Sequence, residues 1–385
     1  MHNIYKYDWL VVGAGLFGAT FANLMAEKGK KVLVMDKRYH IGGNCYLEVH
    51  DGIPLHKYGP HIFHTSSKAA WEYVNQFAEF NNFINAPKAL YVDKKNREQK
   101  LFSLPFNMNT FHDMFGVITP SVAKSILKNE IDTYMEKLGR EPENLEEQAN
   151  CLVGPTIYKY LIKHYTERQW GRKCSELDKD IIKRLPVRLS YNNNYFNDKY
   201  QGVADYTTMI DKMLSKCDVA LNEDYLVHKE EHDKLAEHVL YTGPIDRYFN
   251  YCLGPLEWRA VELRTWSTDP SDTQGVAVIN NVGPDGDWTR TIEHKYFNCM
   301  DENTILTKNW YSKEYPVEWN PRDESLPDPS YPIYTSHTKY LFDQYKRLAD
   351  KEEKVIFGGR LADFAYRDMD DTVLAAMELF SEVNG

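Results

Sequence analysis

The sequence predicts an α/β fold, in which a Rossmann-like domain is combined with an inserted helical-bundle domain and an antiparallel β-sheet domain. Short apolar runs at residues 9–12 and 32–35 flank a helix-forming stretch, an arrangement typical of a β-α-β unit with buried parallel strands. Apolar residues recur at helical spacing over much of residues 68–185. Beyond residue 187, apolar and polar residues alternate in short segments, which predicts an antiparallel sheet.

The order of these patterns divides the chain into three regions. Strand patterns at residues 239–243 and 355–357 return to the Rossmann-like domain, and residues 370–380 predict a final helix. Residues 316–332 are rich in Pro, Asp and Ser and predict a surface loop. The predicted Rossmann-like domain comprises residues 1–67, 200–245 and 345–385, the helical domain residues 68–186, and the sheet domain residues 187–199 and 246–344.

The composition argues against several classes of protein. Lys and Arg total 46 against 56 Asp and Glu, and the net charge of −10 gives no general attraction to nucleic acid or anionic membranes. The 6 cysteines form no C-x-x-C pair, so neither a zinc finger nor a disulfide framework is expected. We find no signal peptide and no run of about 20 apolar residues. These features predict a cytoplasmic protein with no metal site, membrane span or nucleic-acid partner.

The strongest local motif is a glycine-rich turn between the first predicted strand and helix. Gly13, Gly15 and Gly18 follow the G-x-G-x-x-G pattern, which allows a tight turn, backbone approach to a pyrophosphate and close helix packing. The helix start that follows offers backbone N–H groups to the diphosphate. Asp36 ends the second strand, where a carboxylate accepts hydrogen bonds from ribose hydroxyls. The sequence therefore predicts a dinucleotide cofactor.

Two further glycine segments favour FAD over NAD. Residues 42–44 place Gly-Gly-Asn shortly after the second strand, which allows another backbone approach to a long cofactor. A distant segment at residues 356–360 repeats the strand-then-glycine form and precedes Asp368 and Met369 at a helix start. These two residues are placed to meet an isoalloxazine ring. Because FAD is long enough to contact both ends of a chain, the first domain is predicted to be an FAD-binding domain.

A set of co-linear motifs extends over nearly the whole chain. It includes Tyr-Gly-Pro-His-Ile-Phe-His-Thr at residues 58–65, Tyr-Thr-Glu-Arg-Gln-Trp-Gly at residues 165–171 and Phe-Gly-Gly-Arg-Leu at residues 357–361. The other motifs lie at residues 103–107, 182–188, 194–196, 241–246 and 291–295. With these motifs the chain resembles the prokaryotic UDP-galactopyranose mutases.

The resemblance implies an isomerase that interconverts UDP-galactopyranose and UDP-galactofuranose without net redox change and supplies galactofuranose for cell-surface glycans. It implies a non-covalent FAD that must be reduced, and that attacks the anomeric carbon as a nucleophile with UDP as the leaving group. It further implies an electron donor for FAD, a homodimer, and a mobile substrate loop near residues 170–188.

The resemblance also assigns residues to the site. Arg184 and Arg290 match diphosphate-binding arginines, a role that suits guanidinium groups in an acidic chain. Tyr165 matches a tyrosine that stacks on uridine. The residues assigned to catalysis are Arg184, Arg290 and His64. Those assigned to substrate binding are Asn85, Tyr165, Thr166, Trp170, Arg184, Tyr195, Arg259, Asn280, Arg290, Glu314, Tyr331, Tyr366 and Asp368. Those assigned to the cofactor are Gly13, Gly15, Leu16, Phe17, Gly18, Asp36, Lys37, Gly43, Asn44, His61, Ile62, Arg360, Tyr366, Asp368 and Met369.

The chain departs from the family pattern at several positions. His164 stands where Gly is expected, and Phe364 replaces an expected Tyr. The segment that contains Asp205 lacks the double glycine usual before its tyrosine. These departures are expected to alter the substrate pocket. His64 follows the family pattern, which favours galactose over N-acetylgalactosamine.

Two other functions stay open from the sequence. The N-terminal motif also fits an FAD-dependent oxidase or dehydrogenase of the amine-oxidase type, although the paired arginines and the loop at Trp170 argue against it. A non-catalytic nucleotide-sugar binder would share the fold, but the presence of Arg184, Arg290 and His64 argues against that role. The sequence also leaves open the exact sugar, including a deoxyhexose on another nucleotide.

Overall fold

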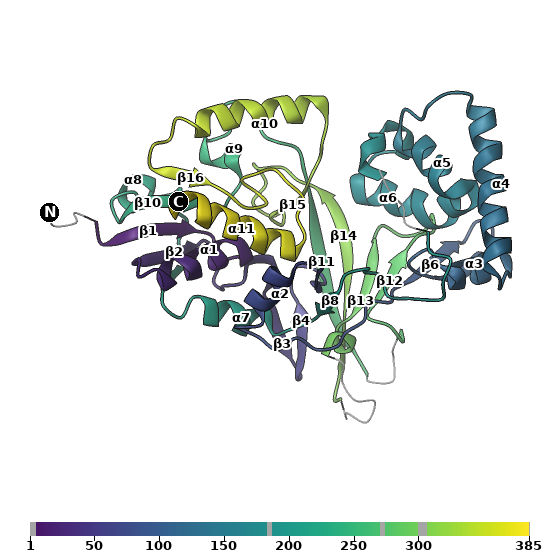
Figure 1. The fold of residues 1–385 in the computed structure, drawn as a ribbon, viewed down its shortest axis with the longest axis horizontal. Coiled ribbons are helices and arrows are strands. Elements are labelled where there is room, and N and C mark those ends of the chain that lie inside the picture. The colour runs from purple at the N-terminus through teal and green to yellow at the C-terminus, as the bar shows by residue number, and fades with distance from the viewer. Residues whose placement is uncertain (1–4, 183–186, 270–273, 299–305, 385) are drawn as a thin grey trace.

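The computed structural model describes residues 5–182, 187–269, 274–298 and 306–384. Figure 1 shows the Rossmann-like domain at one end of the molecule, the helical domain at the other, and a long sheet between them. The predicted combination of a Rossmann-like domain, helices and a mainly antiparallel sheet is confirmed.

The Rossmann-like domain is built on a 5-stranded parallel sheet. Two of its strands, β10 and β16, come from late in the chain and extend the sheet beyond β1, as the sequence predicts. Helices α1 (Leu16–Glu27), α7 (Tyr206–Met213) and α11 (Met369–Asn384) share one apolar core with this sheet. The strand order is β16 (Val355–Phe357), β10 (Ala236–Tyr241), β1 (Tyr7–Val12), β2 (Val32–Asp36) and β9 (Asp218–Leu221).

Small elements connect this domain to the central sheet. Strands β3 (Leu47–His50) and β4 (Ile53–His56) form one antiparallel pair, and β5 (Phe63–Thr65) and β8 (Tyr200–Gly202) form another. The turn between β4 and β5 carries the predicted residues His61 and Ile62. Short 3₁₀ helices lie at Gly43–Cys45, Cys174–Glu176, Lys179–Ile182 and His294–Asn298.

The central sheet has 7 strands and joins the two ends of the molecule. All its neighbouring strands run antiparallel except β12 and β6, which pair in parallel. β14 and β15 overlap residues 316–332, so only the stretch between them forms the predicted loop. The order is β15 (Pro329–Pro332), β11 (Trp258–Thr268), β14 (Asn309–Glu318), β13 (Arg290–Glu293), β12 (Val278–Asn281), β6 (Lys88–Asp93) and β7 (Glu98–Ser103).

Strands β6 and β7 correct the expectation that helices dominate residues 68–185. β6 alternates half-buried and buried residues, the period of a strand, and its buried side chains Ala89 and Tyr91 pack against the helical domain. Phe102 of β7 joins the same core. The sheet thus extends beneath the helices, and its apolar side chains form part of the hydrophobic core of the helical domain.

The helical domain holds α3 (Met108–Phe115), α4 (Pro120–Leu138), α5 (Leu145–Ile157) and α6 (Lys163–Trp170). α4 begins at Pro120 and ends before Gly139, as predicted. α5 is kinked at Gly154, whose φ is +80°, and continues as a π-helical turn at Tyr158–Ile162 before α6. Glu130 of α4 accepts hydrogen bonds from both the backbone N–H and the hydroxyl of Thr156, at 3.1 and 2.6 Å. This contact caps the helix that restarts after the kink.

The remaining helices are α2 (Lys68–Val74), α8 (Lys229–His232), α9 (Ile245–Tyr248) and α10 (Ser336–Ala349). α9 and α10 pack with Trp258 and Phe364 in a separate apolar cluster. Within the described ranges, no helix has the length and apolar character needed to cross a bilayer. The same ranges contain no group of His, Cys, Asp and Glu suited to a metal ion.

Candidate functional site

The predicted glycine turn forms one wall of a cavity of about 590 Å³ at the carboxyl ends of β1 and β2. Gly13 has a φ of +113°, and a Cβ at this position would lie 2.1 Å from Thr242 Oγ1. A Cβ on Gly18 would lie 2.0 Å from the carbonyl oxygen of Gly13. Both positions therefore require glycine, for the turn and for the close approach of α1 to β1.

The start of α1 opens into this cavity. Its N-cap residue is Gly15, which has no side chain to cap the helix, and its first turn carries no acidic residue. The N–H groups of a first helical turn have no partner within the helix. An anion such as a diphosphate is therefore favoured beside Leu16 and Phe17, which line the cavity.

The other two glycine segments meet the first turn, as the FAD prediction requires. Gly43 has a φ of +56°, and a Cβ there would lie 2.8 Å from the Cα of Gly15. Gly359 has a φ of +97°, and a Cβ there would lie 3.2 Å from the ring of Phe17. Residues from the segments 13–18, 42–44 and 359–360 therefore line one cavity.

Asp36 lies at the end of β2 with its carboxylate turned toward the turn. One carboxylate oxygen accepts the N–H of Ala14 at 2.8 Å, and the other accepts the N–H of Arg38 at 2.8 Å. A carboxylate oxygen can accept more than one hydrogen bond. Asp36 thus fixes the turn and can still accept a ribose hydroxyl from the cavity that it lines.

A second cavity of about 350 Å³ adjoins the first. The two share several lining residues: Asn44, His61, Arg360, Arg367 and Met369. The second cavity lies between the Rossmann-like domain, the sheet and α6, and it receives residues from all three. A ligand in the second cavity would therefore meet one end of a cofactor in the first.

Arg290 of β13 lines the second cavity together with Arg360 and Arg367. Its Nε donates to the hydroxyl of Tyr165 at 3.1 Å and lies 3.5 Å from Oε2 of Glu314. Burial opposes its charge, but Glu314, Tyr165 and Tyr331 together outweigh that effect and raise the pKa of Arg290 above its ordinary value. Gly59 allows this arrangement, because a Cβ there would lie 3.1 Å from Glu314 Oε1. The cluster presents a permanently charged guanidinium with a fixed orientation.

His61 lies where the two cavities meet. Its Nδ1 is 2.7 Å from the carbonyl oxygen of Gly59, so Nδ1 carries the proton and Nε2 is an acceptor. Burial lowers the pKa of His61 to about 4, a shift that the hydrogen bond to Gly59 opposes and the charges of Arg360 and Arg290 reinforce. The imidazole is neutral at pH 7. A backbone bond from its N–H to His56 Nδ1, at 3.1 Å, fixes the loop.

His64 lies on the same wall of the second cavity. Its Nδ1 is 2.8 Å from Oδ2 of Asp198, and its Nε2 is 4.0 Å from Oδ2 of Asp368. Its ring stacks on Phe196 at a centroid distance of 3.7 Å and an angle of 16°. Neither Asp198 nor Phe196 was predicted as a site residue, although Phe196 lies in the motif at residues 194–196. Nothing in the local sequence links either residue to a histidine more than a hundred residues earlier.

Tyrosines form much of the remaining wall. Tyr331 and Tyr366 stack with ring centroids 5.9 Å apart. The N–H of Tyr195 donates to the carbonyl oxygen of Asn85 at 2.7 Å, and Arg188 donates to the Tyr195 carbonyl at 2.9 Å. Tyr195 and Tyr366 expose 45% and 56% of their surface, so both hydroxyl-bearing rings are accessible to a ligand.

Most of the predicted site residues line one or both cavities. Those around the first are Gly13, Gly15, Leu16, Phe17, Gly18, Asp36, Lys37, Gly43, Asn44, His61, Arg360 and Met369. Those around the second are Asn44, His61, Ile62, His64, Asn85, Tyr165, Tyr195, Asn280, Arg290, Glu314, Tyr331, Arg360, Tyr366, Asp368 and Met369.

Four predicted residues are placed differently or lie outside this description. Thr166 and Trp170, on α6 beside Tyr165, do not line either cavity. Arg259 donates through Nε to the carbonyl oxygen of Gln169 at 3.0 Å, and its guanidinium supports the C-terminal end of α6. Arg184 lies outside the described residues, within residues 183–186 of the predicted substrate loop.

Comparison with known proteins agrees with this arrangement. A family model described as UDP-galactopyranose mutase matches residues 160–366, and one described as an NAD(P)-binding Rossmann-like domain matches residues 11–77. A probable UDP-galactopyranose mutase from Klebsiella pneumoniae is 36% identical over 97% of this chain and 94% of its own length. The chain belongs to the UDP-galactopyranose mutase family. A dTDP-fucopyranose mutase from Escherichia coli is also similar, at 32% identity over 96% of each chain.

Solved structures support the fold of this UDP-galactopyranose mutase family member. A crystal structure of reduced UDP-galactopyranose mutase superposes with a TM-score of 0.69 at 12% identity, over 98% of this chain and 94% of the other. A putrescine oxidase superposes with a TM-score of 0.56 at 12% identity, over 99% of each chain. At such identities the likeness concerns the fold alone. Family membership makes the chain an isomerase, and with the Rossmann-like domain it supports a flavin cofactor.

The departures from the family pattern have local structural roles. Asp205 caps α7 by accepting the N–H of Thr208 at 3.0 Å. Phe364 is buried and meets Trp258 edge to face at 4.9 Å. His164 lies on α6 with Nδ1 3.7 Å from Oε2 of Glu167. None of the three lines either cavity.

Proposed function

We propose that this chain interconverts UDP-galactopyranose and UDP-galactofuranose, using a non-covalent FAD that must be reduced. The observation that carries the proposal is the Arg290 cluster, in which a fixed cation stands in a cavity that adjoins the cofactor cavity. A nucleotide sugar brings a diphosphate that requires such a cation in an otherwise acidic protein. The product would supply galactofuranose for cell-surface glycans.

The residues around the first cavity fit FAD. The uncapped start of α1 would hold the diphosphate, and Asp36 would hold the ribose next to it. At the junction with the second cavity, Arg360 and Met369 would lie by the isoalloxazine ring, with neutral His61 offering Nε2 as an acceptor for a ring N–H. When bound and reduced, FAD supplies the nucleophile for the anomeric carbon, with UDP as the leaving group.

The residues of the second cavity would bind and orient the substrate. Arg290 would hold the diphosphate, and Glu314 and Tyr165 keep its guanidinium from turning away. Hydroxyls of Tyr195, Tyr331 and Tyr366 can donate to phosphate without adding charge. The amides of Asn85 and Asn280 can bond to the base or the sugar, and Tyr165 offers a ring on which uracil can stack. Arg184, on the substrate loop, is proposed as the second cation.

The activity is tested by incubating UDP-galactofuranose with the protein and dithionite, and separating the products by chromatography. UDP-galactopyranose should form with reduced protein and not with oxidised protein. Absence of UDP-galactopyranose under reducing conditions, from protein that holds FAD, would refute the proposal. Oxidised sugar with stoichiometric loss of flavin absorbance would instead favour an oxidase.

A second candidate substrate follows from one comparison. The dTDP-fucopyranose mutase relative matches nearly the whole chain at an identity close to that of the UDP-galactopyranose mutase relative. A dTDP-6-deoxyhexose differs from UDP-galactopyranose by an added methyl group on the base, the loss of the 2′-hydroxyl on the nucleoside ribose and the loss of the 6-hydroxyl on the hexose. The ratio of kcat/KM values for the two substrates, measured in one competition reaction, decides between them.

The expected partners and location are also proposals. We propose an external electron donor that reduces FAD, because the proposed isomerisation itself yields no electrons. A homodimer and a cytoplasmic location complete the proposal. Light scattering of the purified protein and fractionation of cells measure these two properties directly.

A further inference from the structure

One segment around the cofactor cavity comes from outside the Rossmann-like domain. The segment at residues 319–329 connects β14 to β15 of the central sheet and continues into the first residue of β15. Every residue of this segment except Arg322 and Ser325 lines the first cavity, and these two are exposed. We call residues 319–329 the strap, because they cross from the sheet to the end of β2.

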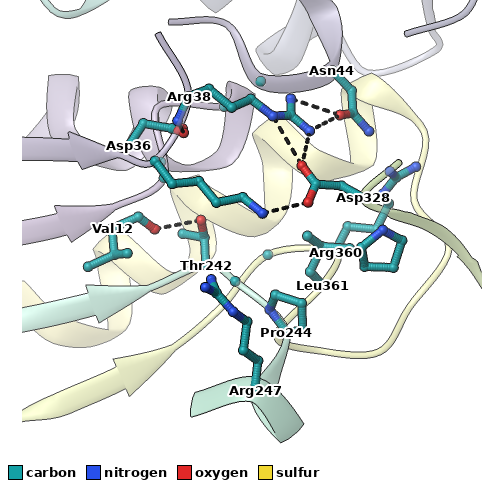
Figure 2. A pocket seen from close by; sticks show the side chains of 18 of the residues that line it. Val12, Asp36, Arg38, Asn44, Thr242, Pro244, Arg247, Asp328, Arg360 and Leu361 are labelled. Carbon is teal, nitrogen blue, oxygen red and sulfur yellow. Dashed lines mark hydrogen bonds and ion pairs between the residues drawn. The ribbon is translucent and has the colours of Figure 1, made fainter. Parts of the chain in front are cut away.

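Asp328, near the C-terminal end of the strap, forms ion pairs with two residues of the Rossmann-like domain. Asp328 accepts a hydrogen bond from Lys37 Nζ at 2.5 Å through one oxygen, and from Arg38 Nη2 at 2.7 Å through the other. Arg38 Nε adds a contact of 3.2 Å with the second oxygen. Figure 2 shows Arg38 reaching Asp328 and Asn44 together. Both basic residues follow Asp36 directly, so the fastening lies at the ribose end of the cavity.

The electrostatics favour this fastening. Burial acts against the charge of Asp328, but Lys37 and Arg38 outweigh it and lower the pKa of Asp328 to about 2. The Arg38 side chain exposes only 16% of its surface, and its guanidinium lies 4.3 Å from the ring centroid of Tyr58. Three donor contacts from two cations to one carboxylate resist solvent screening better than a single exposed ion pair.

The chemistry of the strap suits the nucleoside part of a dinucleotide. Asp323 and Glu324 of the strap face the same cavity as Glu223 and Asp224, which follow β9. Carboxylates repel a diphosphate but accept hydrogen bonds from hydroxyl and amino groups. The diphosphate is therefore expected at the start of α1, with the adenosine between Asp36 and the strap.

The strap itself has limited freedom to open by bending. It contains Pro321, Pro327 and Pro329, which fix their own φ angles. Turn contacts join Asp323 N–H to the Asn320 carbonyl at 3.1 Å and Leu326 N–H to the Asp323 carbonyl at 3.2 Å. Opening is therefore expected to require the breaking of the Asp328 ion pairs with Lys37 and Arg38, rather than unfolding of the segment.

From these observations we infer that the strap closes the ribose end of the cofactor cavity, and that the ion pairs of Asp328 with Lys37 and Arg38 keep the dinucleotide from leaving. This inference rests on the proposed binding of FAD. It assigns to Arg38 and Asp328 a role in cofactor retention that is separate from the chemistry in the second cavity.

The test is the rate at which FAD leaves the holoprotein. Protein loaded with FAD is diluted and passed through a desalting column at intervals, and the flavin absorbance that stays with the protein is recorded. Asp328→Asn is expected to release FAD about tenfold faster than wild type, since it loses charge-assisted bonds to two cations. Asp328→Glu, which keeps the charge, should release FAD at an intermediate rate.

Asp132→Asn is the matched control. Asp132 pairs with Lys128 within α4, away from both cavities, and its substitution removes an ion pair of the same chemistry. Its release rate should equal that of wild type. A second measurement needs no variant: wild-type release should accelerate between about 0.1 M and about 1 M salt, where the screening length falls from about 10 Å to about 3 Å. Asp328→Asn should lose most of that response.

The outcomes separate the two proposals. Wild-type release rates in Asp328→Asn, or release from wild type that does not respond to salt, would overturn the role of the strap. A wild-type chain that holds no FAD would instead overturn the proposed function. Faster release in Asp328→Asn with full mutase activity at saturating FAD supports the strap as a retaining element only.

Discussion

The glycine turn allows structural and cofactor-binding roles to be separated with two substitutions. In Gly18→Ala the new Cβ would lie 2.0 Å from the Gly13 carbonyl oxygen, whereas in Gly15→Ala it would lie 3.7 Å from the nearest atom, the Cα of Gly43. Gly15 has a φ of −78°, which any residue can adopt. Gly18→Ala therefore strains the turn itself, and Gly15→Ala mainly adds a methyl group beside the space assigned to the diphosphate.

The magnitudes follow from these distances. Contacts of this kind stay beyond 3.0 Å, so in Gly18→Ala the turn and α1 must separate, at an overpacking cost of about 3 kcal/mol. The gain in helix propensity of about 1 kcal/mol leaves a net loss of about 2 kcal/mol in the free energy of unfolding. For Gly15→Ala, a poorer N-cap costs only about 0.5 kcal/mol. Its FAD affinity should nevertheless fall by about tenfold or more.

Two measurements check this pair of variants. Urea unfolding without added FAD gives the stability of each protein, and titration with FAD gives its affinity. Gly52→Ala is a control for backbone strain alone, because Gly52 has a φ of +80° and no atom within 4 Å of its added Cβ. The reasoning fails if Gly18→Ala unfolds like wild type, or if Gly15→Ala binds FAD with wild-type affinity.

Three further predictions concern other parts of the molecule. Arg290→Lys loses the guanidinium geometry held by Tyr165 and Glu314, so turnover should fall by about 100-fold. The flavin content per protein should stay at the wild-type level. Wild-type turnover in this variant would show that Arg290 has no role in the reaction. Burial lowers the pKa of His294 to about 3 from 6.5, so the unfolded chain binds a proton that the folded chain rejects between these pH values. Stability should therefore fall as the pH drops from about 6.5 toward 3, and urea unfolding of His294→Gln should show a smaller fall. Glu130→Ala removes the cap at Thr156 and should lower the free energy of unfolding by about 2 kcal/mol, whereas Glu136→Ala on the exposed face of α4 should change it by less than about 0.5 kcal/mol.

Patterns within short stretches of sequence were sufficient to predict the main elements of the Rossmann-like domain. The β-α-β unit, the glycine turn and the return of β10 and β16 to the sheet follow from apolar runs and glycine positions, because turns and helix starts are governed by neighbours a few residues apart. The boundaries of α4 could be read in the same way from Pro120 and Gly139. The helical pattern hid β6 and β7, since two short strands among helices leave too few residues for their period to stand out.

The family resemblance predicted which residues belong to the candidate site, but not how these residues contact one another. The family resemblance assigned Arg290, Tyr165 and Glu314 to one site, and the fold brings them into direct contact. The same resemblance placed Arg259 among the substrate residues, whereas the fold uses its guanidinium to support the end of α6. The type of a residue determines which hydrogen bonds and ion pairs it can form. Its actual partners depend on which residues the packed helices and strands bring close to it.

The sequence by itself therefore determined the glycine turn and the family to which the chain belongs, and it predicts the charge that the site must supply. Only the tertiary structure decided that Arg290 is held between Tyr165 and Glu314, that His64 rests on Asp198 and Phe196, and that the strap reaches the end of β2 through Asp328. The physical reason is the length of the chain between the partners. A glycine turn is satisfied within a few residues, but contacts between distant segments exist only after the sheet and the helices have packed.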